Sequence, residues 1–299
     1  MNILELSHLS KSFGSKKVLD DVTFAVPENC VFGFIGRNGA GKTTTMKSIL
    51  GLMETDSGEI KVNGEKVQYG KNSTNRYIGY LPDVPEFYSY MTATEYLRLC
   101  GEITGMSDKE IKNRSDELLK LVGLNGEKHR IKGYSRGMKQ RLGIAQALIN
   151  RPKLLICDEP TSALDPVGRK EILDILSSAK EQTSVLFSTH ILSDVEKICD
   201  RIAFLENGKI ALSGTIDEIK HINSKTEIEL ILKNTEDMVK ISNIFSNCAV
   251  KEGKLIFKNS PDNQMEEIMK FLVTQHIPVQ RLEQREPDLE DLFLEAIEK

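Results

Sequence analysis

The chain lacks a long apolar segment and a surplus of basic residues. Although 39% of its 299 residues are hydrophobic, no apolar run approaches the ~18 residues that a membrane-spanning helix needs. Residues 1–5 have neither the basic start nor the apolar core of a secretory signal. The net charge of −4 argues against binding to nucleic acid through a generally basic surface. We therefore expect a cytoplasmic chain that does not itself cross a membrane and has no nucleic-acid partner.

Cysteines are few and scattered. The five are Cys30, Cys100, Cys157, Cys199 and Cys248. An odd number without zinc-finger or redox spacing does not indicate a metal site or a disulfide framework, so free thiols in a reducing compartment are the simplest account. The sequence also shows no low-complexity segment and no internal repeat, and its length is sufficient for two domains.

A glycine-rich segment at residues 36–44 is the most informative feature that is present. Its sequence, GRNGAGKTT, fits the P-loop pattern G-x-x-x-x-G-K-[ST]. An apolar, strand-like run precedes it at residues 31–35, and a helix-like run follows it at residues 44–50. The alternative is a glycine-rich turn before an ordinary helix, but the flanking strand and helix favour the P-loop.

The P-loop predicts how the chain binds the phosphates of a nucleotide. Glycines let backbone N–H groups curve around the phosphates without clashes from Cβ atoms, and the helix start adds about half a positive charge. Lys42 supplies a full positive charge, and the Thr43 hydroxyl can bind Mg²⁺. The predicted nucleotide-binding residues of this loop are Gly36, Asn38, Gly39, Ala40, Gly41, Lys42, Thr43 and Thr44.

Two carboxylates follow an apolar, strand-like run at residues 153–157. Asp158 can hold Mg²⁺, directly or through water, and Glu159 stands where the strand ends and a side chain can reach a γ-phosphate. A carboxylate in that place can polarise an attacking water molecule. Taken alone, the pair would be better explained as acidic turn residues, but its position downstream of a P-loop favours catalysis.

The hydrophobic pattern predicts an α/β core. Continuous apolar runs at residues 153–157 and 184–188 fit buried strands of a parallel sheet that is covered on both faces. Helical patterns alternate with these runs, and a mainly helical stretch extends from about residue 92 to 122. The leucines at residues 4–9 predict an edge strand.

The character of the chain changes near residue 219. We expect a nucleotide-binding domain at residues 1–218, with a helical subdomain at about residues 85–150, and a small accessory α+β domain at residues 219–299. In this last part, residues 227–232 predict a strand, and apolar residues recur at helical spacing at residues 265–272 and 289–297.

A serine-capped helix start at residues 134–141, YSRGMKQR, resembles the signature helix of the ATP-binding subunits of ABC transporters. Ser135 is a good N-cap residue, and Gly137 allows another group to approach the helix start, which is an anion site. The usual signature is Leu-Ser-Gly-Gly-Gln. The Tyr-Ser-Arg-Gly-Met found here is similar to that of a subgroup of bacterial exporters, the drug- and bacitracin-efflux type. A plain helix cap is the alternative.

Further elements of the ABC family follow in the expected order. Residues 162–165, SALD, resemble the D-loop, although Asp165 before a proline is also a plausible helix start. His190 resembles the switch histidine, and Phe13 resembles the aromatic residue that stacks on adenine. Asp83 stands where the family usually has glutamine, and it is either a residue that reaches Mg²⁺ through water or a turn residue between two prolines.

The resemblance implies an α/β P-loop fold and an ATPase with ATP and Mg²⁺ as ligands. It implies a head-to-tail homodimer in which Ser135 and Gly137 of one copy close over the nucleotide of the other. The catalytic residues that it implies are Lys42, Glu159 and His190, with Thr43, Asp158 and Asp83 at the metal. Separate integral membrane permease subunits would carry out export, which places the chain on the inner face of the cell membrane.

Two alternatives remain open. The first alternative is a soluble ABC-type ATPase that acts on ribosomes or nucleic acid. Such proteins usually have two cassettes or a long coiled-coil insertion, and this sequence shows neither. The second alternative is that the tail domain is a regulatory binding module.

Residues 287–293, PDLEDLF, resemble the ending of many exporter ATPases. An amphipathic helix that packs on the domain is the simpler interpretation of this segment.

Overall fold

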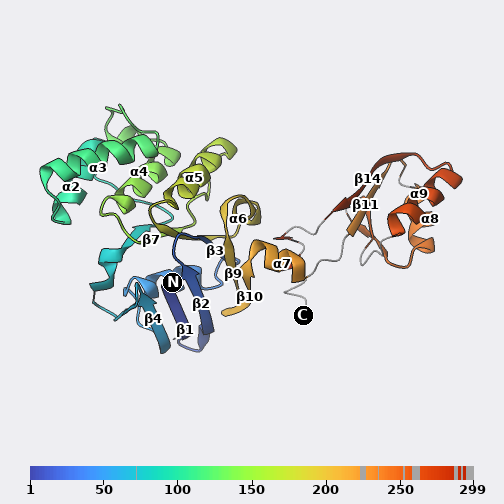
Figure 1. The fold of residues 1–299 in the computed structure, drawn as a ribbon, viewed down its shortest axis with the longest axis horizontal. Coiled ribbons are helices and arrows are strands. Elements are labelled where there is room, and N and C mark those ends of the chain that lie inside the picture. Colours follow the sequence, from blue (N-terminus) through green and yellow to red (C-terminus); the bar gives the residue numbers. More distant parts are fainter. Residues whose placement is uncertain are drawn as a thin grey trace. The chain divides into compact units, whose positions relative to one another are not determined.

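The chain divides into two units, Met1–Ile216 and Asp217–Lys299, in the computed structural model (Figure 1). The structure describes residues 1–71, 73–222, 227–234, 236–251, 253–257, 263–285, 289–290 and 292–293. Within these residues, no helix combines the length and the apolar character that crossing a bilayer requires. Each unit has a buried hydrophobic core of its own, so the two are described separately.

A six-stranded sheet forms the centre of the first unit. Its strand order is β10-β9-β3-β8-β7-β6, and every neighbouring pair except β9 with β10 is parallel. All residues of β3, β7 and β8 are buried, which explains their continuous apolar character. The strands are β3 (Val31–Ile35), β6 (Ile78–Leu81), β7 (Leu154–Asp158), β8 (Ser184–Thr189), β9 (Arg201–Glu206) and β10 (Lys209–Thr215).

The parallel direction of these strands places the functional segments. The carboxyl ends of parallel strands lie at the same edge of a sheet, where ligands of open α/β sheets bind. The P-loop follows β3, the Asp158–Glu159 pair ends β7, and His190 follows β8. Segments that lie far apart in the sequence therefore meet at one edge.

A second sheet covers part of the core with the order β2-β1-β4-β5. The sequence predicts residues 4–9 as an edge strand, and this is wrong, because β1 pairs with β2 on one side and with β4 on the other. The partner strand β4 is remote in sequence, and the leucines fit an inner strand equally well. The strands are β1 (Asn2–Phe13), β2 (Lys16–Pro27), β4 (Ser57–Val62) and β5 (Glu65–Lys66).

Helices of the first unit fall into two groups. Helices α1 (Lys42–Ile49), α5 (Pro166–Ala179) and α6 (Leu192–Ile198) contact the large sheet, whereas α2 (Ala93–Ile103) and α3 (Asp108–Leu121) pack on each other (Figure 1). Helix α4 (Arg136–Leu148) belongs to both groups, because it contacts β6 of the sheet as well as α2 and α3. Capping boxes start two of these helices, Thr92 with Glu95 at α2 and Ser107 with Glu110 at α3. Short 3₁₀ helices, η1 (Ser73–Tyr77) and η2 (Ile131–Gly133), complete this unit.

The second unit has the order β-α-β-β-α-β after the linking helix α7 (Ile216–Ile222). Its sheet order is β12-β13-β11-β14 and all pairs are antiparallel, which is the ferredoxin-like arrangement. Ile228, Leu230, Phe257 and Ile268 are in its core. The elements are β11 (Glu227–Leu232), α8 (Glu236–Ile244), β12 (Cys248–Lys251), β13 (Lys254–Phe257), α9 (Gln264–Thr274) and β14 (Val279–Arg285).

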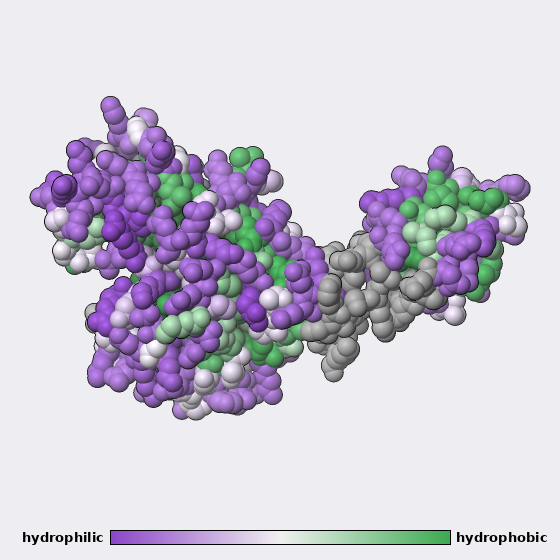
Figure 2. Space-filling view, in the orientation of Figure 1, coloured by the Kyte–Doolittle hydropathy of each residue, from purple (hydrophilic) through white to green (hydrophobic). Residues whose placement is uncertain are grey.

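The mixed α/β core with a small α+β unit is the fold class that the sequence predicts. Of the amphipathic tail pattern, Leu289 and Leu292 are buried, whereas Ala296 and Ile297 lie outside the described residues. The outer surface is mainly hydrophilic on the face shown in Figure 2, with hydrophobic patches between the polar areas.

Candidate functional site

The P-loop adopts a backbone conformation that only its glycines allow. Gly41, which caps α1, has φ +115, and a Cβ atom there would lie 2.7 Å from Leu19 Cδ2. A Cβ atom on Gly36 would lie 2.6 Å from the carbonyl oxygen of Leu205. The loop is therefore tightly packed on its protein side, while its N–H groups and the α1 start remain at the end of β3, where an anion is stabilised.

Lys42 is directed into the loop. Its side chain is only 6% exposed, and its ammonium donates to the carbonyl oxygen of Gly36 at 2.5 Å and to that of Arg37 at 3.3 Å. The same ammonium lies 3.1 Å from Glu159 Oε1. A buried cation needs such partners, and the pair joins the P-loop to the end of β7.

Thr43 and Asp158 form a second link between these segments. Thr43 Oγ1 donates to Asp158 Oδ2 at 2.9 Å, and Ser188 Oγ donates to Asp158 Oδ1 at 2.6 Å. Both oxygens of this buried carboxylate therefore have a hydroxyl partner. A hydroxyl oxygen next to a carboxylate is the kind of donor set that Mg²⁺ uses when phosphate oxygens and water complete its shell, so these residues fit the ion.

Glu159 has an unusual backbone conformation. Its φ is +49, in the left-handed region, which costs about 1–2 kcal/mol for a residue with a Cβ atom. Its N–H donates to both the carbonyl oxygen and the Oγ of Ser188, each at 3.1 Å. These bonds hold the turn against β8 and direct the carboxylate toward Lys42 on one side and toward His190, whose Nδ1 lies 2.9 Å from Glu159 Oε2, on the other.

A cavity of about 390 Å³ brings most of the predicted residues together. Val18, which the sequence analysis did not single out, also contributes to it. The lining residues are Val18, Asn38, Gly39, Gly41, Lys42, Thr43, Thr44, Asp83, Asp158 and Glu159. The cavity therefore collects the cationic, hydroxyl and carboxylate groups that phosphate binding and hydrolysis need.

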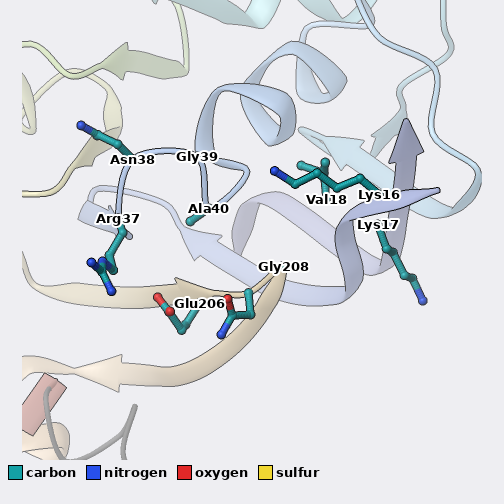
Figure 3. A pocket seen from close by; sticks show the side chains of 10 residues that line it. Lys16, Lys17, Val18, Arg37, Asn38, Gly39, Ala40, Glu206 and Gly208 are labelled. Atoms are coloured by element: carbon teal, nitrogen blue, oxygen red, sulfur yellow. The ribbon is translucent and has the colours of Figure 1, made fainter. Parts of the chain in front are cut away.

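A second cavity, of about 430 Å³, lies beside the P-loop (Figure 3). It shares Val18, Asn38 and Gly39 with the first cavity and is bounded by the turn between β9 and β10. Lys16, Lys17 and Arg37 line it together with the carboxylate of Glu206. It holds none of the carboxylates at the end of β7, so the first cavity is the better candidate for the chemistry.

The structure assigns Asp83 several partners. Its Oδ1 accepts a hydrogen bond from Ser162 Oγ at 2.6 Å and lies 3.5 Å from Arg136 Nη2, and its carbonyl oxygen accepts one from Gln140 Nε2 at 2.7 Å. The carboxylate lines the first cavity, but these contacts direct it toward the segment of residues 162–165 and the start of α4.

Three other predicted residues lie apart from the first cavity. Ser135 caps α4 by accepting a hydrogen bond from the Met138 N–H at 3.2 Å, and it is exposed. A Cβ atom on Gly137 would lie 3.9 Å from Leu164 Cδ2, an ordinary van der Waals contact. Phe13 is 49% exposed at the end of β1, with the Lys11 ammonium 5.6 Å from its ring centre. Within one chain, none of the three lines either cavity.

The segment after Glu159 also shows a backbone feature. Ala163 has φ +52, again in the left-handed region, and Asp165 caps α5 by accepting from the Gly168 N–H at 3.0 Å, before Pro166 at the first turn. The helix-start interpretation of Asp165 is thus confirmed. Sequence reasoning placed Ser162 in a D-loop-like segment without a role of its own and missed Ser188, for which the available signal was a hydroxyl residue at the end of an apolar strand.

Comparison with known proteins identifies the family. The family model described as "ABC transporter" matches residues 19–162, and the model "ATP-binding protein DrrA1-3-like, C-terminal domain" matches residues 214–297. The ABC transporter ATP-binding protein YxlF of Bacillus subtilis is 39% identical over 298 residues, which are 99% of each chain. The bacitracin transport ATP-binding protein BcrA of Bacillus licheniformis is 38% identical over 301 residues, covering 99% of this chain and 97% of that one.

Solved structures agree with this result. A solved ATP-binding subunit of an ABC transporter is 37% identical, with a TM-score of 0.66, and the match covers 74% of this chain and 92% of that one. The predicted resemblance and the P-loop fold class are thus confirmed, and the subgroup includes bacitracin transport ATP-binding proteins. The chain therefore belongs to the ABC transporter family, as an ATP-binding protein with ATPase activity and a DrrA-like C-terminal domain.

Proposed function

We propose that this chain powers an ABC exporter as a head-to-tail homodimer that sandwiches two ATP molecules. The observation that carries this proposal is the junction of Lys42 and Glu159 at one cavity, with His190 in contact with Glu159, while Ser135 and Gly137 at the capped start of α4 do not line that cavity. The site at the P-loop has a cation and a base but lacks the second anion-binding surface. A second copy supplies that surface with its Ser135 and Gly137.

Each residue at the cavity has a role that follows from its contacts. Lys42, the P-loop N–H groups and the α1 start bind the β- and γ-phosphates. Glu159 accepts a proton from the attacking water, and His190 fixes the carboxylate through its contact at 2.9 Å. Thr43 and Asp158 would hold Mg²⁺, which would neutralise charge on the phosphate oxygens.

An apolar hollow supports separate membrane permease subunits as partners. A cavity of about 520 Å³ lies between β6, α2 and the end of α4, and aromatic and aliphatic side chains line most of it. Ile103, which is 76% exposed, and Tyr88 belong to it. Exposed apolar side chains around a hollow fit the insertion of an apolar segment from another protein, and we assign this surface to a cytoplasmic segment of the permease.

The division of labour follows the two units. We assign ATP binding and hydrolysis to residues 1–218 and an accessory role to residues 219–299. The relatives that are named for bacitracin transport support a role in transport, and we take export as the direction. A position on the inner face of the cell membrane follows, because the permease would hold the chain there.

The substitution Glu159→Gln tests the catalytic role and the sandwich together. It keeps the shape of the side chain but removes the base, so we expect ATP hydrolysis to fall by about 10²–10⁴-fold, the usual contribution of a general base. ATP binding should persist, and the variant should accumulate as an ATP-dependent dimer on sizing. The wild-type chain with ATP, and the variant without ATP, serve as controls. Normal hydrolysis by the variant would exclude Glu159 as the base, and a monomer with bound ATP would contradict the sandwich.

A further inference from the structure

Asp83 connects three segments of the ATPase unit. Its carboxylate accepts the hydrogen bond from Ser162 Oγ at 2.6 Å and faces Arg136 Nη2 at 3.5 Å. Arg136 Nη2 also donates to Ser162 Oγ at 3.4 Å. One charged cluster therefore joins the loop after β6, the loop after β7 and the first residue of α4.

The loop of Asp83 is held in place independently of this cluster. The carbonyl oxygen of Asp83 accepts from Gln140, whose side chain is fully buried on α4. The Asp83 side chain also lines the cavity of Thr43 and Asp158. Because the backbone is anchored, the Asp83 carboxylate can release Arg136 and Ser162 by rotation of its side chain alone.

The Arg136 side chain is held by weak contacts, and its guanidinium group is well suited to bind phosphate. Its side chain is 46% exposed, and within the described part of the chain Asp83 is the one carboxylate within 4 Å of it. A separation of 3.5 Å is longer than the 2.7–2.9 Å of a strong charge-assisted hydrogen bond. Guanidinium binds phosphate with two parallel hydrogen bonds. Arg136 stands between Ser135 and Gly137, on the surface that we assign to the partner's ATP.

We propose that Arg136 is a further phosphate-binding residue, which each copy contributes to the ATP held by its partner, and that Asp83 retains it while no nucleotide is present. The inference rests on the proposed sandwich of two copies. Asp83 is a positioning residue in this scheme. An interaction made in only one of two states favours that state, so the Asp83–Arg136 pair stabilises the separated copies and raises the ATP concentration at which they close.

The test measures the ATP concentration that gives half-maximal dimer, by sizing, in the Glu159→Gln background. Adding Asp83→Asn should lower this concentration about twofold to fivefold, the size of a partly exposed ion pair. Adding Arg136→Gln should raise it about tenfold or more, the loss of a hydrogen bond to a charged group. The triple variant should need the same ATP concentration as the double variant of Glu159→Gln and Arg136→Gln, because Asp83 acts only through Arg136. Glu86→Gln, the same change of charge in the same loop, is the control and should have no effect.

A second measurement examines the retaining contact without any dimer. In the nucleotide-free protein, Asp83→Asn should accelerate amide hydrogen exchange at residues 136–139, and Glu86→Gln should not. Unchanged exchange, or an effect of Asp83→Asn that persists without Arg136, would overturn the role of Asp83. Dimerisation that ignores Arg136→Gln would overturn its phosphate contact. If the Glu159→Gln parent binds ATP but stays monomeric, the sandwich itself is wrong, and the contact in the partner's site falls with it.

Discussion

At the scale of single residues, Ser188 organises the two acidic residues at the end of β7. Its hydroxyl donates to Asp158 and accepts from the Glu159 N–H, while its carbonyl oxygen accepts from the same N–H. One side chain thus orients the predicted metal-binding carboxylate and the turn that presents the base. A group that fixes two reacting residues contributes to turnover through their geometry.

Ser188→Ala should lower kcat for ATP hydrolysis about tenfold or more, because a hydrogen bond to a charged group is worth about 1.5–3 kcal/mol. The affinity for ATP itself should change little, since Lys42 and the P-loop remain. Steady-state ATPase assays and binding of a fluorescent ATP analogue measure the two effects. Ser184→Ala, at the other end of β8, is the matched control, and equal losses from both substitutions would indicate damage to the strand instead.

Gly41→Ala should remove nucleotide binding. The backbone there has φ +115, and the added methyl group would lie 2.7 Å from Leu19 Cδ2, so the loop must move away from its cradle conformation. We also expect the free energy of unfolding to fall by roughly 1 kcal/mol or more. Calorimetric titration with ATP and thermal unfolding measure both. Gly133→Ala, where a Cβ atom meets nothing within 4 Å, should retain binding, and ATP binding by Gly41→Ala would refute the cradle.

At the scale of elements, the start of α2 depends on a pair of reciprocal hydrogen bonds. The Glu95 carboxylate accepts from the Thr92 N–H at 2.8 Å and from Thr92 Oγ1 at 3.0 Å, and Thr92 Oγ1 accepts from the Glu95 N–H at 3.3 Å. The backbone hydrogen bond from Thr92, followed by the one from its side chain, lowers the pKa of Glu95 below its usual value of 4.5. The ionised carboxylate is therefore the form that caps the helix.

A pH dependence of stability follows from this direction. Since the folded pKa of Glu95 lies below its unfolded value, its contribution is complete above about pH 4.5 and is lost as the pH falls through the folded pKa. Glu95→Ala should therefore lower the melting temperature at pH 7, and the difference from wild type should shrink toward pH 3. Asp116→Ala, an exposed change on α3, controls for a loss of surface charge. A difference that stays constant with pH would contradict the capping role.

At the scale of the whole molecule, the two units have separate cores, and we expect them to respond separately. Phe257→Ala removes a fully buried ring from the core of the second unit, which should cost that unit about 3–5 kcal/mol. ATP affinity should remain that of the wild type, because nucleotide binding belongs to the first unit. Calorimetric unfolding and ATP titration give the two quantities. Val273→Ala, at a position that is 75% exposed, is the control, and a loss of ATP affinity in Phe257→Ala alone would show that the units act together.

Much of the architecture could be predicted from local patterns. The buried strands β7 and β8, the capping boxes of α2 and α3, and strand β11 all follow from periodicity or from short spacings. The edge position of β1 was predicted wrongly, because a strand's neighbours are set by pairing with remote segments such as β4. A strand that is buried on one face has the same alternating hydrophobic pattern whether it lies at the edge or in the middle of the sheet.

The amino-acid sequence by itself determined that the chain carries a P-loop and two carboxylates after a buried strand, because these chemistries need neighbouring residues at fixed spacing. Only the tertiary structure decided which hydroxyl groups donate hydrogen bonds to the carboxylate oxygens of the site. Ser188 meets Asp158 from 30 positions away, and Ser162 meets Asp83 from 79 positions away. Such contacts depend on the order of the parallel strands in the sheet, because this order decides which loops meet at the carboxyl ends of the strands. No local spacing in the sequence encodes that order.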